Sequence, residues 1–210
     1  ELGKLYHIYC SFRAYRSIPG LGGPFTTKSL AGGGVLIDWG VHYLDLILYC
    51  IGSPALKSVS AAAYSEMAKD MKSYVFTDMW AGPPDYNGTF DVEDFVTGMI
   101  RTSGPTITFN GAWAQNINER AAFIEFLGDK AGIKLQYGGN FTIWSSKDGM
   151  LLETTPTFTM SDMFYDEVDA FIKCAQEGKK IRSNIDNVIA CSLLMDKIYE
   201  SAAIGKEVEF

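Results

Sequence analysis

The stretch GGGVLIDWGVHYLD, residues 32–45, decides how this chain is interpreted, because it joins a glycine run to two aspartates and one of only two histidines. At 3.6 residues per turn, His42 follows Asp38 by one turn and Asp45 follows it by nearly two, so the three side chains project within roughly 60° of one another. Apolar residues repeat at helical spacing on another side. The stretch therefore predicts a helix over residues 35–51 that packs on one side and presents this polar trio on the other.

Three interpretations of the polar trio remain open from the residues alone. The first is an ordinary solvated set of charged side chains on a helix. The second is a metal site, but no further histidine lies nearby and the four cysteines form no closely spaced pair, so we expect no metal. The third is proton transfer, in which His42 exchanges a proton with a substrate hydroxyl while a carboxylate orients the imidazole. Such a transfer is needed when a hydroxyl-bearing carbon loses a hydride.

Three separated segments carry a resemblance to a known family. They are the glycine run followed by Asp38, Gly40, His42 and Asp45, the loop YRSIPG at residues 15–20, and the stretch YESAAIGKEV at residues 199–208. The first looks like the catalytic-helix motif of the Gfo/Idh/MocA family, the glucose-fructose oxidoreductase and inositol dehydrogenase type. The second resembles the arginine-rich loop after that family's first catalytic-domain strand, and the third resembles its C-terminal ending. The similarity spans nearly the whole chain.

The resemblance implies roles for residues of the polar trio and of the loop. Asp38 and His42 match the aspartate and histidine of the family's catalytic set, whose lysine belongs to a preceding domain. Asp45 matches a recurrent motif position, and we expect it to bind substrate. Family position also favours Arg16 as a ligand of substrate oxygens.

Two residues at the end of a predicted strand are further candidates for substrate binding. Trp113 could pack on a sugar ring and Asn116 could hydrogen-bond it, although an aromatic residue at a strand end more often belongs to the core. We include both in the candidate site.

The family's nucleotide-binding domain is not found in this sequence. Family members begin with a Rossmann domain that binds NAD or NADP and ends in a Glu-Lys-Pro segment bearing the catalytic lysine. A dinucleotide fingerprint needs G-x-G-x-x-G between a strand and a helix. Residues 20–25 and 32–37 both fail at the last glycine, and no Glu-Lys-Pro occurs. We therefore expect residues 1–210 to be one C-terminal domain for substrate binding and oligomerisation, inactive without the missing domain.

The activity implied by the resemblance is hydride transfer between a nicotinamide cofactor and a secondary hydroxyl of a sugar, inositol or related polyol. The cofactor would be NAD or NADP, held mainly by the missing domain, which also contains the residues that choose between them. Two alternatives stay open. One is an NAD-dependent glycoside hydrolase of the same family, which would release no net NADH. The other is a non-catalytic sugar-binding module.

Composition narrows the classes of partner. The net charge is −7 and lysines and arginines form no cluster, which argues against a nucleic-acid or anionic-membrane surface. We find no apolar run of the roughly 18 residues that a membrane span needs and no leader at the start, so we expect a cytoplasmic protein.

The order of elements predicts an α+β fold with strands first and helices last. We expect strands over residues 5–13, 56–64, 91–102, 106–115, 121–127, 133–136, 141–145 and 150–153. Two final helices carry apolar stripes, at residues 164–175 and 188–202. They should cover one face of a large, mostly antiparallel sheet, like the C-terminal domain of glyceraldehyde-3-phosphate dehydrogenase. The opposite face should be rich in aromatic residues and methionine and should form a homo-oligomer.

Overall fold

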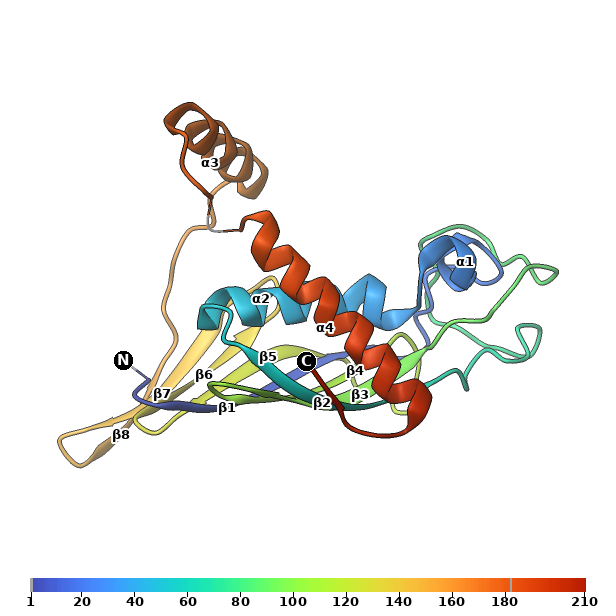
Figure 1. Cartoon of the computed structure of the whole chain (residues 1–210). Coiled ribbons are helices and arrows are strands. Elements are labelled where there is room, and N and C mark those ends of the chain that lie inside the picture. Colours follow the sequence, from blue (N-terminus) through green and yellow to red (C-terminus); the bar gives the residue numbers. More distant parts are fainter. Residues whose placement is uncertain (1, 182) are drawn as a thin grey trace.

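One mixed sheet organises the fold (Figure 1). The computed structural model describes residues 2–181 and 183–210. Their strands are β1 (Leu5–Arg13), β2 (Leu56–Tyr64), β3 (Phe95–Thr102), β4 (Thr106–Ala112), β5 (Ala121–Gly128), β6 (Ala131–Gln136), β7 (Phe141–Lys147), β8 (Met150–Thr154) and β9 (Val208–Glu209). The spatial order is β8-β7-β6-β5-β1-β4-β3-β2-β9, and β1 with β4 is the parallel pair among otherwise antiparallel neighbours. The predicted mostly antiparallel sheet is confirmed.

The helices lie largely on one side of this sheet. They are α1 (Lys28–Ala31), α2 (Val41–Ile51), α3 (Met163–Glu177) and α4 (Ile185–Ile204). Alternate residues of β1, namely Ile8, Cys10 and Phe12, are buried under α2, and the ring of Phe12 lies 5.1 Å from that of Tyr43 on this helix. The main core therefore lies between the sheet and the layer formed by α2 and α4.

The predicted helix over residues 35–51 is confirmed, with a departure from regular geometry near its start. Residues Leu36–Gly40 form a π-helical segment that runs directly into α2. At the other end Gly52 adopts φ +76° and its N–H bonds to Leu48, which ends the helix. Because a π-helical turn holds more residues than an α-helical turn, Asp38 is rotated relative to the residues of α2.

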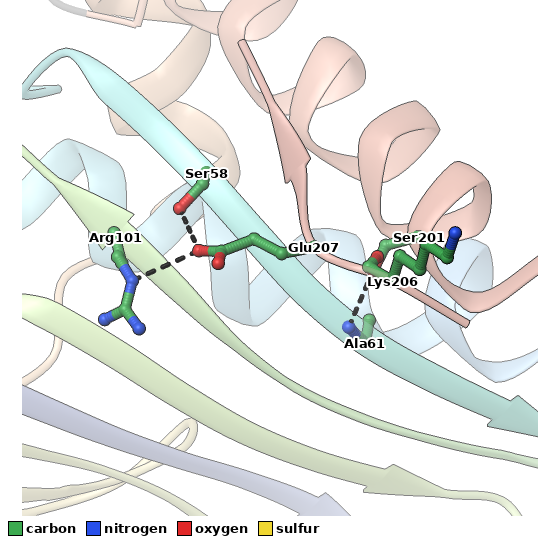
Figure 2. A network of polar contacts seen from close by, with 6 residues as sticks. All are labelled: Ser58, Ala61, Arg101, Ser201, Lys206 and Glu207. Atoms are coloured by element: carbon green, nitrogen blue, oxygen red, sulfur yellow. Dashed lines mark hydrogen bonds and ion pairs between the residues drawn. The ribbon is translucent and has the colours of Figure 1, made fainter. Parts of the chain in front are cut away.

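Polar contacts fasten the C-terminal end of α4 to the sheet (Figure 2). Ser201 Oγ accepts a hydrogen bond from the backbone N–H of Ala61 on β2, at 2.9 Å. After the helix, the carboxylate of Glu207 accepts from the Ser58 hydroxyl and from Nε of Arg101, the latter at 3.1 Å. These two donors hold the pKa of Glu207 below its usual value. The predicted covering of the sheet is thus confirmed for α4.

The same prediction is wrong for α3, which stands away from the sheet (Figure 1). Its ends are well formed, because Asp162 accepts from the backbone N–H groups of Phe164 and Tyr165 and Gly178 closes the helix at φ +63°. The apolar stripe remains exposed, with Phe164 75% and Phe171 65% accessible. Local signals therefore make this helix, while no element of the described chain covers its stripe.

The sheet face away from α2 and α4 is more polar than predicted. Alternation along β1 directs His7 and Tyr9 to this face. His7 Nε2 lies 3.1 Å from Thr108 Oγ1, and Tyr9 Oη accepts from Asn110 at 3.1 Å while its ring contacts Phe123. The expected load of apolar side chains is therefore partly replaced by hydrogen-bonded pairs, and oligomerisation through this face stays a prediction.

The helical segment Lys28–Ile51 is long and apolar enough to cross a membrane by length and composition, whereas no such segment was expected from the sequence. In the fold, Leu44, Ile47 and Leu48 of this segment are buried in the main core. Its apolar character is accounted for by packing against the sheet and α4.

Candidate active site

A hollow of about 380 Å³ opens beside the π-helical segment and brings together three of the predicted site residues: Asp38, His42 and Trp113. The remaining walls are largely apolar and are formed by Pro24, Phe25, Leu30, Ala31, Gly33, Ile37 and Val41. Asp38 and His42 come from the helix, whereas Trp113 comes from the chain just after β4. A carboxylate, an imidazole and an indole therefore face a small, mostly apolar space.

Asp38 is held by an indole donor. Trp113 Nε1 donates a hydrogen bond to Asp38 Oδ2 at 2.9 Å, and the Trp113 side chain is completely buried. Burial raises the pKa of Asp38 above its usual value, whereas the hydrogen bond from Trp113 and the charge of His42 act in the opposite direction. Trp113 therefore belongs to the core and orients the carboxylate, and its predicted contact with a sugar ring stays a prediction.

His42 is exposed on the helix surface, where its imidazole is accessible from the hollow. Within residues 2–181 and 183–210, the Asp38 carboxylate accepts a hydrogen bond from Trp113 and is not hydrogen-bonded to His42. The two side chains therefore line the same hollow without contacting each other through a hydrogen bond. In this structure the imidazole is not oriented by Asp38, although a carboxylate was expected to orient it.

Asp45 lies away from this first hollow. Together with His42 it lines a neighbouring space of about 430 Å³ toward α4, whose walls include Cys191. Burial, followed by the charge of Asp45, raises the pKa of Cys191 to about 12. The polar trio is thus divided. Asp38 lines the first hollow, Asp45 lines the space toward α4, and His42 lines both. The π-helical segment explains the division, because it rotates Asp38 away from the position that regular helical spacing predicts.

The start of the catalytic-motif helix is braced by Glu93, which is only 8% exposed. Its carboxylate accepts from the backbone N–H groups of Gly34 and Leu36, at 2.9 and 3.0 Å, and from Tyr199 Oη at 2.8 Å. The backbone carbonyl of Glu93 also accepts from Val35 N–H at 3.1 Å. Glu93 therefore satisfies donors that the first helical turn leaves open and ties that turn to β3 and α4.

The glycine run is required by this brace. A Cβ on Gly34 would lie 2.0 Å from the Glu93 carbonyl oxygen, and a Cβ on Gly33 would lie 2.0 Å from Tyr199 Oη. Glycine at both positions therefore allows the close approach of Glu93 and Tyr199 to the backbone. Glu93 and Tyr199 themselves were not predicted, because no local spacing connects them with residues 33–36.

The residue after Glu93 supports the other wall of the site. The backbone carbonyl of Asp94 accepts from Trp113 N–H at 2.9 Å, and its carboxylate accepts from Met67 N–H at 2.6 Å. Burial raises the pKa of Asp94 to about 6. The strand predicted over residues 91–102 accordingly begins only at Phe95, because Glu93 and Asp94 bond to the helix start and to neighbouring loops.

Arg16 and Asn116 meet each other but do not line the hollow that holds Asp38. Arg16 Nη2 donates to Asn116 Oδ1 at 2.5 Å, and Nη1 donates to the Val75 carbonyl at 3.0 Å. The guanidinium also lies 5.7 Å from the ring of Tyr74. In this structure Arg16 therefore joins three loops, and its predicted contact with substrate stays a prediction.

The lining of the first hollow fits part of a nicotinamide cofactor and not the whole of it. Phe25, Ile37 and Val41 offer apolar contact to a flat ring, while Asp38 and His42 lie beside it. No lysine or arginine is among the lining residues, so a diphosphate finds no cationic partner in this part of the described chain. Within residues 2–181 and 183–210, no group of three or more His, Cys, Asp or Glu side chains is arranged to hold a metal ion.

The fold and the site together define a class: an α+β domain with an aspartate and a histidine on one helix that packs on a large, mostly antiparallel sheet. A sequence profile described as the GFO/IDH/MocA C-terminal domain matches residues 1–134. The chain belongs to the GFO/IDH/MocA family, as the resemblance of its motifs implied.

One curated relative is similar along the whole chain. It is the D-glucoside 3-dehydrogenase of Escherichia coli K12, 31% identical over 213 residues, which cover 99% of this chain and 57% of the relative. The chain thus spans somewhat more than half of that enzyme's length.

Solved structures confirm the fold. A levoglucosan dehydrogenase in complex with NADH and levoglucosan superimposes with a TM-score of 0.78 at 19% identity, covering 99% of this chain and 59% of that one. An aldose-aldose oxidoreductase from Caulobacter crescentus gives a TM-score of 0.75 at 17% identity, covering 99% and 56%. At these identities the likeness concerns the fold.

Proposed function

We propose that this chain is the substrate domain of an NAD(P)-dependent oxidoreductase that oxidises a secondary hydroxyl of a sugar or glycoside. The observation that carries the proposal is the placement of Asp38 and His42 on one hollow whose other walls are largely apolar. The names of the relatives, a glucoside dehydrogenase and a levoglucosan dehydrogenase, favour a sugar over other polyols.

In this proposal His42 accepts the proton of the hydroxyl while the C–H bond of the same carbon breaks and its electron pair leaves as hydride, so that the alcohol becomes a ketone. Asp38, fixed by Trp113, accepts a hydrogen bond from a neighbouring hydroxyl and favours positive charge on His42. The apolar walls limit the access of water to the ring that carries the reacting carbon.

The hydride acceptor would be NAD or NADP, which when bound supplies a nicotinamide ring able to take up two electrons. Ile37 and Val41 would contact this ring from the present chain, and the diphosphate would be held by a second domain. The exposed stripe of α3 offers such a domain a surface on which to pack.

The partners in this proposal are a sugar substrate and further copies of the protein. Tyr9 and Phe123 on the open sheet face would contribute to contacts between copies. The homo-oligomeric state and the cytoplasmic location stay predictions from the sequence.

The test uses the complete protein that carries this chain, supplied with NAD and NADP and a panel of glucosides. We expect His42→Ala to lower turnover by roughly 10²- to 10⁴-fold, because the proton acceptor is lost. His7→Ala is the matched control: it removes the other histidine, on the opposite sheet face beside Thr108. Near-normal turnover of His42→Ala, or an equal loss in His7→Ala, would contradict the proposal.

A further inference from the structure

Besides the first hollow and the space toward α4, His42 lines a hollow of about 220 Å³ on the sheet side of the helix, here called the second hollow. Its other walls include the rings of Trp39, Tyr43 and Tyr137 and the side chains of Arg120 and Arg13. Arg13 donates from Nε to Ser11 Oγ at 3.0 Å. Because His42 lines both the first and the second hollow, the two spaces adjoin at its side chain.

The aromatic wall of this second hollow is fixed by contacts from two distant parts of the chain. Tyr43 is buried on α2, directly after His42, and the ring of Tyr137 stacks on it with centroids 4.3 Å apart and planes 24° from parallel. The backbone N–H of Tyr137 donates to the Ala122 carbonyl at 3.0 Å, which holds the turn after β6 in place. Tyr137 is nevertheless 42% exposed, so part of its ring is available to a ligand.

Arg120 supplies a positive charge beside this wall. Arg120 lines the same hollow as Tyr43 and Tyr137. Burial raises the pKa of the Tyr43 phenol, and the charge of Arg120 acts in the opposite direction. Across residues 2–181 and 183–210, no carboxylate is found within ion-pair distance of Arg120. Although the chain has a net charge of −7, the N–H groups of the Arg120 guanidinium are therefore not paired with a carboxylate of the described residues. Their planar arrangement suits a carboxylate of a ligand.

We propose that the second hollow is a subsite for the aglycone of the sugar substrate, and that it selects a flat aromatic ring bearing a carboxylate. The ring would lie against Tyr137 and the carboxylate would bond to Arg120. This inference rests on the proposed function, because it takes His42 as the point from which the substrate extends.

The experiment measures kcat/KM in the complete protein with NAD and NADP for methyl, phenyl and 4-carboxyphenyl β-D-glucopyranoside. We expect the carboxyphenyl glucoside to exceed the phenyl glucoside by roughly three- to tenfold, and Arg120→Gln to abolish this ratio. Tyr137→Ala should lower the ratio of phenyl to methyl glucoside by roughly three- to tenfold. Lys147→Gln, which removes one positive charge at the exposed end of β7, should change neither ratio.

The methyl glucoside reports on the integrity of each variant. The inference requires both changes, so it is wrong if Arg120→Gln keeps the carboxylate preference or if Tyr137→Ala keeps the preference for the phenyl group. In either case, continued oxidation of the methyl glucoside would leave the proposed function standing. If no glucoside reduces either cofactor, the proposed function fails and the subsite fails with it.

Discussion

The helical run from Val35 to Ile51 is enclosed by the sheet and α4, whereas α3 is surrounded by solvent in the described chain (Figure 1). Both segments have apolar stripes and glycine stops. The first is further held by Glu93 and Tyr199, which lie far away in sequence. The comparison shows that local pattern makes a helix, while long-range contacts decide whether its side chains form a site.

The largest effect on stability is expected at Gly34, where the contact with Glu93 leaves no space for a side chain. Gly34→Ala places a Cβ against the Glu93 carbonyl, so we expect the free energy of unfolding to fall by about 3 kcal/mol. Gly23→Ala is the control, because nothing lies within 4 Å of its Cβ position and its φ is −92°. Urea denaturation measures both variants. Equal stabilities would show that the brace yields readily and would remove the main contrast with α3.

The next effect concerns Asp38. Trp113→Phe removes the indole donor, and we expect a loss of about 2 kcal/mol in stability and a higher pKa of Asp38. Carboxyl ¹³C NMR titration measures the pKa. Trp144→Phe is the matched control, since that indole donates to Glu153 on an exposed hairpin at 3.1 Å, where we expect less than about 0.5 kcal/mol. An unchanged pKa of Asp38 would show that Trp113 does not tune the carboxylate.

Asp94 should make stability depend on pH. Its pKa of about 6 in the folded chain exceeds the roughly 4 of an unfolded aspartate, so its contribution is present below pH 4 and is lost as the pH rises through 6. Asp94→Asn lacks this loss. The free energy of unfolding of Asp94→Asn minus that of the parent protein should therefore rise by about 2 kcal/mol from pH 4.5 to pH 7. Urea denaturation of both proteins at both pH values measures this change. A constant difference would contradict the assigned pKa.

The smallest effect is expected on α3. Phe171→Ser changes a 65% exposed side chain, so the free energy of unfolding of this chain should change by less than about 0.5 kcal/mol. Ile47→Ala, in the buried helix, should cost about 3 kcal/mol by the same measurement. A large loss in Phe171→Ser would show that the α3 stripe is covered within this chain, which would remove the contrast between the two helices.

The sequence predicted those parts of the fold that depend on neighbouring residues. The bounds of β1 and β2 match the expected ranges, because alternation within a strand is local. The separation of Asp38 from Asp45 was missed because regular spacing cannot reveal the π-helical segment that contains Asp38. Glu93 and Tyr199 were missed because only the folded chain brings them to the glycine run.

The central claim is that the hollow at Asp38 and His42 is where a sugar carbon gives up hydride. The most direct measurement incubates the complete protein with NAD or NADP and a methyl glucoside carrying deuterium at C2, C3 and C4, followed by mass spectrometry of the reduced cofactor. We predict a reduced cofactor one mass unit heavier, and at least a hundredfold less of it in His42→Ala. Two results would contradict the account. One is reduced cofactor that carries no deuterium, and the other is an equal amount of deuterated cofactor formed by His42→Ala and by the parent protein.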